Sequence, residues 1–311
     1  MKLQGREITR GLKFPEGPIA MHDGSILVVE IEGASLVRVT PDGQKQVVAE
    51  LGGGPNGAAI GPDGKCYVCN NGGFNWVYEA DGYVRPHGRA DAYTGGSIQR
   101  VDLTTGAVET LYTHCDGEPI KGPNDIVFDR DGGFWFTDHG KSYGRLMDRG
   151  ALFYARIDGD FIVEAAFPLI TPNGVGISPD GQTLYVSETE TGRLWAFPIT
   201  APGTLAKEPW PSPAGGRFIG GPTGYQRFDS LAVEANGNIC VASLVRGGIS
   251  VFSPEGGLLE FHEAPEGYCT NICFGGPDMR TAYVTLSGYG RLIAVDWTRP
   301  GLPLVHQQPT R

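Results

Sequence analysis

One pattern recurs six times along this chain in the same register: an acidic or amide residue, followed seven residues later by an Asp-Gly-type turn. In five copies Gly directly follows the Asp or Asn of the turn, and each turn leads into a short apolar run such as SILVVE, GFWFTD or RTAYVT. Repetition at a fixed offset indicates a repeat architecture, in which each copy builds one supersecondary unit. We call the six polar residues the head residues: Glu16, Asn56, Asn124, Asn173, Asp229 and Asn271.

Each repeat has the pattern of four short β-strands. One strand joins the head residue to the turn, a second follows the turn, and a third begins at a glycine, as in RLWAFPI after Gly192. Fourth strands are predicted at QVVAEL, VETLYTH, FIVEAAF and LLEFHEA. Four antiparallel strands repeated six times predict an all-β fold, a six-bladed β-propeller. Because no domain boundary or long helix is apparent, residues 1–311 are expected to form a single propeller domain.

The repeat spacing also predicts how the ring closes and where additional residues are inserted. The last repeat lacks an obvious fourth strand, and a ring closes only if the two termini share a blade. The segment around Arg6 to Thr9 or the segment 302–307 could supply that strand, and the amino-terminal segment is preferred.

The second repeat carries about twenty extra residues, 71–95, and the third a smaller addition, 139–149. An antiparallel second strand ends beside the start of the first, so both additions are predicted to lie over the face that carries the head residues.

Composition limits the partners and the compartment. The formal net charge of −10, without any Lys/Arg-rich stretch, disfavours nucleic acid and anionic membranes as partners. The segment MKLQGREITR has no apolar signal core and no run approaches the length of a membrane span, so a cytoplasmic protein is expected. Cys66, Cys69 and Cys240 fall within predicted strands, so we expect core thiols rather than a disulfide set. The oligomeric state is left open.

In a ring, the six head residues would meet at the axis. Buried carboxylates and amides are costly unless water, mutual hydrogen bonds or a cation satisfy them. Glu16, Asp229, Asn124 and Asn173 offer only oxygen ligands, the set that Ca²⁺, Mg²⁺ and Mn²⁺ prefer. No His or Cys occupies a head position, which disfavours a tetrahedral zinc site. The alternative, in which these residues only cap strands and hold channel water, stays open at this point.

Five segments of the chain resemble a known family, the gluconolactonase/regucalcin family, which is also called the senescence marker protein and luciferin-regenerating-enzyme-like family. The resemblance spans nearly the whole chain. It implies a six-bladed propeller that holds one divalent metal ion in its axial channel and hydrolyses a sugar lactone; Ca²⁺ is the first expectation, with Mg²⁺, Mn²⁺, Zn²⁺ and Fe²⁺ as alternatives. The segments are FPEGP (14–18), GPNDIVFDRDGGFWFTD (122–138), TPNGVGISPDGQTLYVSE (171–188), FDSLAVEANGNICVAS (228–243) and TNICFGGPDMRTAYVT (270–285).

The resemblance also implies roles for individual residues. Carried over by motif, the metal-binding positions fall on Glu16, Asn173 and Asp229, and on Asn124, which in some members contacts the substrate instead. Asp229 is the predicted general base as well as a ligand. The animal regucalcin type has a substrate-touching Arg at the position of Gly122, so its substrate contacts do not transfer to this chain.

Substrate contacts are therefore expected from polar residues near the axis and from the second-repeat insertion. His139 could donate a proton to the leaving hydroxyl, or it could be an ordinary loop histidine beside a glycine. No G-x-S-x-G motif and no phosphate-binding glycine loop is present. The candidate substrate-binding residues are Asn56, Asn70, Trp76, Asn124 and His139, with Phe74, Arg85 and His87 as further insertion residues.

The chemistry of a lactone suits these residues. A lactone is an activated ester whose carbonyl oxygen gains negative charge as water attacks, and a divalent cation stabilises that charge. A carboxylate within reach of the water can accept its proton. The sequence thus predicts a metal-dependent hydrolase that opens an aldonolactone to the aldonic acid. Two alternatives remain: a hydrolase of another ester, such as an organophosphate, and a non-enzymatic propeller that binds calcium or a ligand.

Overall fold

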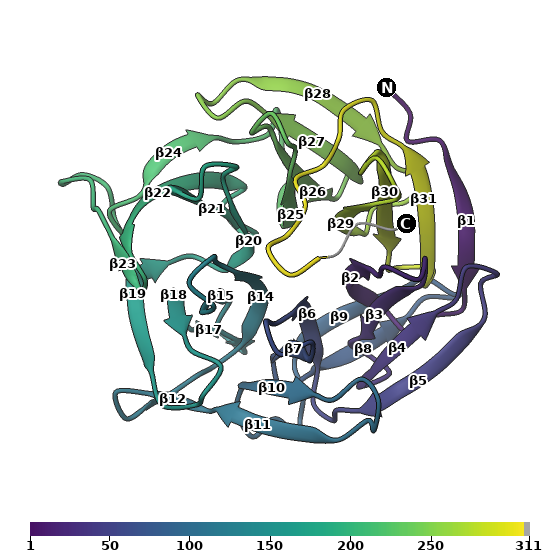
Figure 1. The fold of residues 1–311 in the computed structure, drawn as a ribbon, viewed down its shortest axis with the longest axis horizontal. Helices are drawn as coiled ribbons and strands as arrows, with labels where there is room; N and C mark the ends of the chain where they lie inside the picture. The colour runs from purple at the N-terminus through teal and green to yellow at the C-terminus, as the bar shows by residue number, and fades with distance from the viewer. Residues whose placement is uncertain (308–311) are drawn as a thin grey trace.

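The computed structural model describes residues 1–307, and there the strands form six antiparallel sheets arranged around a central axis (Figure 1). The predicted all-β, six-bladed propeller is confirmed. The last four residues of the predicted domain, 308–311, lie outside the described residues. Within residues 1–307 there is no helix of the length and apolarity needed to cross a membrane.

The first three blades each contain four strands in the predicted order, from the axis outwards. The first blade contains β2 (Pro15–Ala20), β3 (Ile26–Glu30), β4 (Ser35–Val39) and β5 (Lys45–Glu50). The second contains β6 (Pro55–Ile60), β7 (Cys66–Asn70), β10 (Ser97–Val101) and β11 (Val108–Tyr112). The third contains β14 (Pro123–Phe128), β15 (Phe134–Asp138), β18 (Gly150–Ala155) and β19 (Ile162–Leu169).

The remaining blades follow the same plan, with one difference in the fourth. There the outer strand is β24, which follows a long loop and carries no sequence signal of its own. The fourth blade contains β20 (Pro172–Ile177), β21 (Thr183–Glu188), β22 (Arg193–Ala201), the short β23 (Thr204–Leu205) and β24 (Arg217–Gly220). The fifth contains β25 (Arg227–Val233), β26 (Ile239–Leu244), β27 (Gly248–Phe252) and β28 (Leu258–Glu263). The sixth contains β29 (Cys269–Gly275), β30 (Thr281–Leu286) and β31 (Arg291–Asp296).

The amino terminus closes the ring. Strand β1 (Gly5–Arg10) pairs antiparallel with β31, so the sixth blade takes its outer strand from the start of the chain. The preferred amino-terminal closure is thereby confirmed. Residues 302–307, the less preferred alternative, instead cross the end of the axial channel, as the yellow segment in Figure 1 shows.

Three short hairpins complete the described chain. The hairpin β8 (Phe74–Tyr78) with β9 (Val84–Arg89) is built from the second-repeat insertion. The pair β16 (Ser142–Tyr143) with β17 (Leu146–Met147) is built from the third-repeat addition. The pair β12 (His114–Cys115) with β13 (Glu118–Pro119) precedes the third blade.

The hydrophobic core lies between neighbouring blades. One cluster, for example, joins Trp135 and Leu152 of the third blade to Leu184 and Phe197 of the fourth. Alternating apolar residues of each sheet thus pack against the next sheet, as stacked repeats require. All six described cysteines are free thiols, five of them buried, in agreement with the expected core role.

Hydroxyl side chains connect the inner strands of adjacent blades through hydrogen bonds. The Thr137 hydroxyl accepts a hydrogen bond from Asp125 N in its own blade and donates to Asn173 O in the next. Ser187 does the same between Gly174 N and Asp229 O. The strands approach so closely that a Cβ on Gly174 would lie 2.5 Å from Leu231 N. These contacts hold the head residues of successive blades in fixed relative positions.

We expect Ser187→Ala to lower the free energy of unfolding by about 2 kcal/mol, because Gly174 N and Asp229 O both lose a buried partner. Urea denaturation would measure this change. The exposed Ser142 provides the control, because Ser142→Ala should cost almost nothing. Equal urea-denaturation midpoints for the two variants would refute the proposed role of Ser187 in connecting the two strands.

Candidate active site

The six head residues all lie at the start of an inner strand and are all buried. The first strands of neighbouring blades contact one another around the axis. The structure therefore brings together side chains that are separated by up to 255 positions in the sequence, as in the Asn271–Glu16 pair. The exposed fractions are Glu16 2%, Asn56 6%, Asn124 5%, Asn173 4%, Asp229 8% and Asn271 5%.

Glu16 is held by two neutral donors. Asn271 Nδ2 donates to Glu16 Oε2 at 2.8 Å, and Gly17 N donates to the same oxygen at 2.9 Å. No Lys or Arg forms an ion pair with Glu16 within the described residues. A buried carboxylate of this kind lacks the counter-charge that would normally compensate its desolvation.

The side-chain oxygen atoms of the two candidate amide ligands, Asn173 and Asn124, differ in their hydrogen bonding. Asn173 Nδ2 donates to Thr189 Oγ1 at 3.0 Å, which fixes the amide so that Oδ1 faces the other way, and only the long 3.4 Å contact from Ser230 Oγ reaches that oxygen. Asn124 Oδ1 is buried and has no hydrogen-bond partner in residues 1–307. An acceptor left unpaired in a buried position costs about 1–3 kcal/mol, unless a cation or water occupies its lone pairs.

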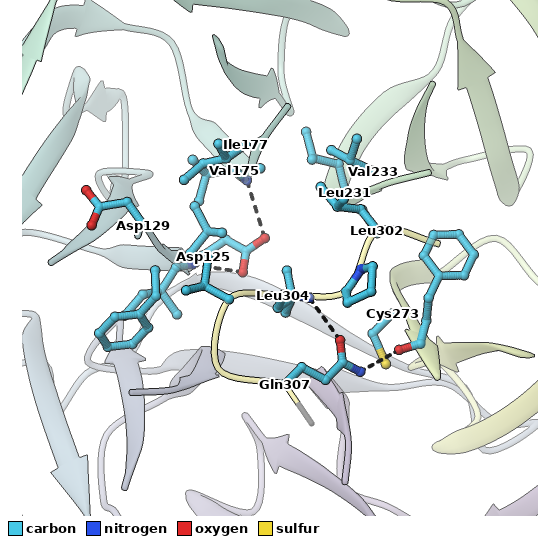
Figure 2. Close-up of a pocket in the computed structure, with 18 of the residues that line it drawn as sticks. Asp125, Asp129, Val175, Ile177, Leu231, Val233, Cys273, Leu302, Leu304 and Gln307 are labelled. Atoms are coloured by element: carbon cyan, nitrogen blue, oxygen red, sulfur yellow. Dashed lines mark hydrogen bonds between the residues drawn. The ribbon is translucent and has the colours of Figure 1, made fainter. Parts of the chain in front are cut away.

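A third carboxylate, Asp125, lies beside this group and was not among the predicted residues. Its Oδ1 accepts a hydrogen bond from Ile126 N at 2.9 Å and its Oδ2 accepts one from Val175 N at 3.4 Å. Asp125 lines a cavity of about 260 Å³ (Figure 2). The cavity extends to the face of the ring that carries the Asp-Gly-type turns, here called the turn face, where Leu302 to Gln307 cover it. The only sequence signal was an Asp after the head residue, where three other repeats have Gly.

The three carboxyl groups of Glu16, Asp125 and Asp229 lie close enough for the charge of one to affect the pKa of another. Burial raises the pKa of Glu16 and of Asp229 well above the usual range, and Glu16 raises the pKa of Asp229 further by repulsion. Burial likewise raises the pKa of Asp125 to about 7, with a contribution from Glu16. Three acidic groups that resist ionisation in the metal-free chain form an environment that a divalent cation would relieve.

We expect the metal-free protein to lose stability between about pH 5 and pH 8. Unfolded carboxyl groups ionise near pH 4, whereas these folded groups keep their protons to higher pH. The folded state thus binds more protons in this window, and stability falls as the pH rises through the folded pKa values, by about 1 kcal/mol per unit for each such carboxyl. Thermal unfolding of chelator-treated protein checks this; a Tm that rises over the same window would contradict it.

The residue types fit a divalent cation. The predicted ligands Glu16, Asn124, Asn173 and Asp229 are buried, offer only oxygen atoms, and include the unpaired Asn124 Oδ1. Ca²⁺ accepts such carboxylate and amide oxygens. No group of three or more His, Cys, Asp or Glu side chains is placed to hold a metal in the part of the chain that the structure describes. That finding does not bear on the predicted set, which contains two carboxylates and two amides.

Among the other predicted residues, Asn70 forms four side-chain hydrogen bonds within the protein. Its Oδ1 accepts hydrogen bonds from Gly54 N and Gly72 N, and its Nδ2 donates to Gly52 O and Gln99 Oε1. Asp138, at the equivalent end of β15, accepts from Lys121 N and Gly122 N in the same manner. Both side chains hold the loop that leads into a head residue, and a substrate contact by Asn70 stays a prediction.

His139 and Trp76 lie near the rim of this face. His139 is half-buried, and burial together with the nearby Lys141 lowers the pKa of its imidazole well below the usual range. The ring is therefore neutral at pH 7, so it can form hydrogen bonds there but does not hold a second proton to donate. The Trp76 ring lies 5.0 Å from the Phe14 ring, two residues before Glu16.

The hairpin that carries Trp76 reaches across several blades. Tyr78 donates to Glu32 Oε1 of the first blade at 2.8 Å, and Tyr83 accepts from Tyr268 N, just before β29 of the sixth, at 3.0 Å. Val84 N also bonds to Gly288 O, just beyond β30. These partners precede first strands or follow second strands, so the hairpin contacts the side of the ring where the inner strands begin.

The fold and these groups define a class of protein: β-propellers with a buried, all-oxygen candidate metal site at the axis. The chain belongs to the family described as SMP-30/gluconolactonase/LRE-like region, whose model matches residues 14–288. The predicted family is thereby confirmed.

Individual relatives are distant but cover most of the chain. A gluconolactonase of Zymomonas mobilis is 25% identical over 304 residues, which cover 86% of this chain and 75% of the relative. A diisopropyl-fluorophosphatase of Loligo vulgaris is 25% identical over 321 residues, covering 95% and 92%. The crystal structure of a calcium-binding protein, regucalcin, from Agrobacterium tumefaciens superposes with a TM-score of 0.74 at 19% identity, covering 100% of this chain and 98% of that one.

Proposed function

We propose that this protein is a metal-dependent hydrolase that opens a sugar lactone to the corresponding acid. The observation that carries the proposal is the buried Glu16–Asp229 carboxylate pair beside the unpaired Asn124 Oδ1. Membership of a family that includes proteins named gluconolactonase and lactonase supports the reaction class. The Agrobacterium protein named as calcium-binding supports Ca²⁺ as the first ion to test.

Glu16, Asn124, Asn173 and Asp229 would hold the ion through their side-chain oxygen atoms. The bound cation supplies Lewis-acid stabilisation of the negative charge that develops on the lactone carbonyl oxygen. Asn271 Nδ2 and Gly17 N keep the Glu16 carboxylate oriented by their hydrogen bonds to Oε2. Thr189 orients the Asn173 amide in the same way.

Asp229 would act as the general base. It accepts a proton from water as the water oxygen bonds to the carbonyl carbon, and the ring C–O bond then breaks. The ring oxygen leaves as an alkoxide and takes up a proton, which gives the hydroxy acid. A bound cation would favour the ionised form of the Asp229 carboxyl, which is the form that can accept this proton.

The test is proton release from a panel of aldonolactones by metal-stripped protein to which single divalent ions are added back. We expect no turnover by the stripped protein above the spontaneous rate, and turnover with Ca²⁺ at a stoichiometry of about one ion per chain, as expected for one axial site. An organophosphate ester in the same panel tests the alternative that the protein hydrolyses an ester of another kind. Stoichiometric metal binding without any turnover would overturn the proposal in favour of a binding protein.

A further inference from the structure

Two cations from different blades meet at the rim of the active face. Arg89 ends β9 of the second-blade insertion, and Lys141 lies between β15 and β16 of the third blade. Lys141 lies over the Phe74 ring at 4.0 Å and over the Tyr93 ring at 5.6 Å, while the Arg89 guanidinium lies 5.0 Å from that same Tyr93 ring. A shared aromatic ring thus brings two like charges close together.

Lys141 is buried and has only neutral partners for its ammonium group. It is 3% exposed, and Nζ donates to Asn71 Oδ1 at 2.9 Å and to Gly73 O at 3.0 Å. Burial lowers the pKa of Lys141 to about 7; Asp138 opposes the effect and Arg89 adds to it. An ammonium group has three N–H donors, so one remains for a further acceptor.

Arg89 has no acceptor at all among residues 1–307. Its guanidinium lies 4.4 Å from the Tyr143 ring in addition to its contact with Tyr93, but none of its N–H groups forms a hydrogen bond or an ion pair there. The nearby Asp148 already accepts hydrogen bonds from Lys141 N and from the Tyr143 hydroxyl. Arg89 is half-buried, and its guanidinium carries five N–H donors.

A third donor is also without a partner. Asn71 is 2% exposed, and its Oδ1 is fixed by the bonds from Lys141 Nζ and Gly73 N. Its Nδ2 is therefore assigned as the free end of the amide, and it is buried with no partner in the described chain. Unpaired buried donors of this kind are uncommon and call for a ligand, an ion or water.

This cluster adjoins the candidate active site. Asn71 N donates to Gly54 O, two residues before Asn56. Lys141 follows Asp138, whose carboxylate holds Gly122 N, two residues before Asn124. Asn71 and Lys141 thus lie beside the loops that lead into the head residues of the second and third blades.

We propose that Arg89, Lys141 and Asn71 form an anion-binding subsite, so that the lactone substrate carries an anionic group, a carboxylate or a phosphate, remote from the reacting carbonyl. This proposal rests on the proposed lactone hydrolysis. A planar guanidinium and an ammonium are the groups that proteins use to bind carboxylates and phosphates. In a chain of net charge −10, a local pair of cations is needed to attract an anion to this face.

Three substrates test the subsite: a neutral aldonolactone, the same lactone with a phosphate on its terminal carbon, and an aldarolactone with a free carboxylate. The readout is the ratio of kcat/KM for each anionic lactone to that for the neutral one. We expect Arg89→Gln to lower this ratio about tenfold or more, because a hydrogen bond to a charged group contributes about 1.5–3 kcal/mol. Arg89→Lys should retain part of the preference. The phosphate and carboxylate lactones together show which anion the site accepts.

Arg145→Gln is the matched control. Arg145 is exposed in the β16–β17 turn, so its substitution changes the net charge equally without touching the cluster. An equal fall in the ratio for Arg145→Gln, or a wild-type protein without preference for either anionic lactone, would overturn the subsite while leaving lactone hydrolysis intact.

A binding measurement keeps the two proposals separable. Calorimetry compares the terminally phosphorylated aldonic acid with the plain aldonic acid on wild-type and Arg89→Gln protein. Tighter binding of the phosphorylated acid, lost in the variant, supports the subsite even if no lactone is turned over, in which case only the proposed function fails. Equal affinities would count against the subsite directly.

Discussion

Asp229→Asn is expected to abolish lactone hydrolysis, with kcat falling by about 10³-fold or more, and to weaken binding of the divalent ion. The substitution removes a negatively charged ligand and the proposed base while keeping the size of the side chain. Loss of a positioned base alone costs about 10²–10⁴ in rate, and loss of charge stabilisation adds to it.

The same substitution should leave the metal-free fold as stable as before or more stable. Burial, Glu16 and Asp125 all raise the pKa of Asp229, so its ionised form is disfavoured in the folded, metal-free chain. A neutral Asn relieves that repulsion. Because the substitution also removes a metal ligand, Ca²⁺ should no longer raise the Tm of the variant. Differential scanning calorimetry with and without Ca²⁺ measures both effects.

Asp160→Asn is the control for this experiment, because Asp160 is an exposed residue between β18 and β19. It should keep turnover, metal binding and the metal-induced Tm shift. An Asp229→Asn protein that retains wild-type turnover in the presence of a chelator would disprove the proposed mechanism. A variant that unfolds at all pH values would show that Asp229 is structural.

Glu234→Gln is expected to cause the largest loss of stability, about 3 kcal/mol. Glu234 is fully buried, and it accepts hydrogen bonds from Trp297 Nε1 at 2.7 Å and from Asn238 Nδ2 at 2.9 Å, and forms an ion pair with Arg299. Removing one charge of such a pair leaves the guanidinium without its deepest partner, and a broken buried pair costs about 3–5 kcal/mol. Arg299 keeps its second partner, Glu260, so the lower figure applies.

The effect should be visible beyond the fifth blade. Leu302 N donates a hydrogen bond to Val233 O, beside Glu234, and Gln307 Nε2 donates one to Phe274 O at 2.7 Å. Loosening Arg299 therefore loosens the segment 302–307 that closes the turn face of the channel. Urea denaturation gives the energy, with the exposed Glu255→Gln as control. A loss below 1 kcal/mol would show that Glu234 is replaceable by an uncharged acceptor.

Much of the candidate site could be predicted because the repeat ties chemistry to position. A head residue seven places before each turn starts the inner strand, so the ring must gather all six, and Glu16, Asn124, Asn173 and Asp229 were predicted and found buried at the axis. Asp125 was missed because alternation along one strand does not show a side chain directed into a shared channel. The outer strand β24 was missed because it follows a long loop without a repeat signal.

By itself, the sequence determined the six-bladed propeller with its inner strands and turns, and the family of the protein, since these depend on periods and motifs that are local along the chain. Only the tertiary structure decided which groups share one environment: Glu16, Asp125 and Asp229, whose mutual repulsion contributes to raised pKa values, and Arg89 with Lys141. These residues lie in different blades, and pairwise distance and burial set their electrostatic energies. Spacing along the chain carries no record of either quantity.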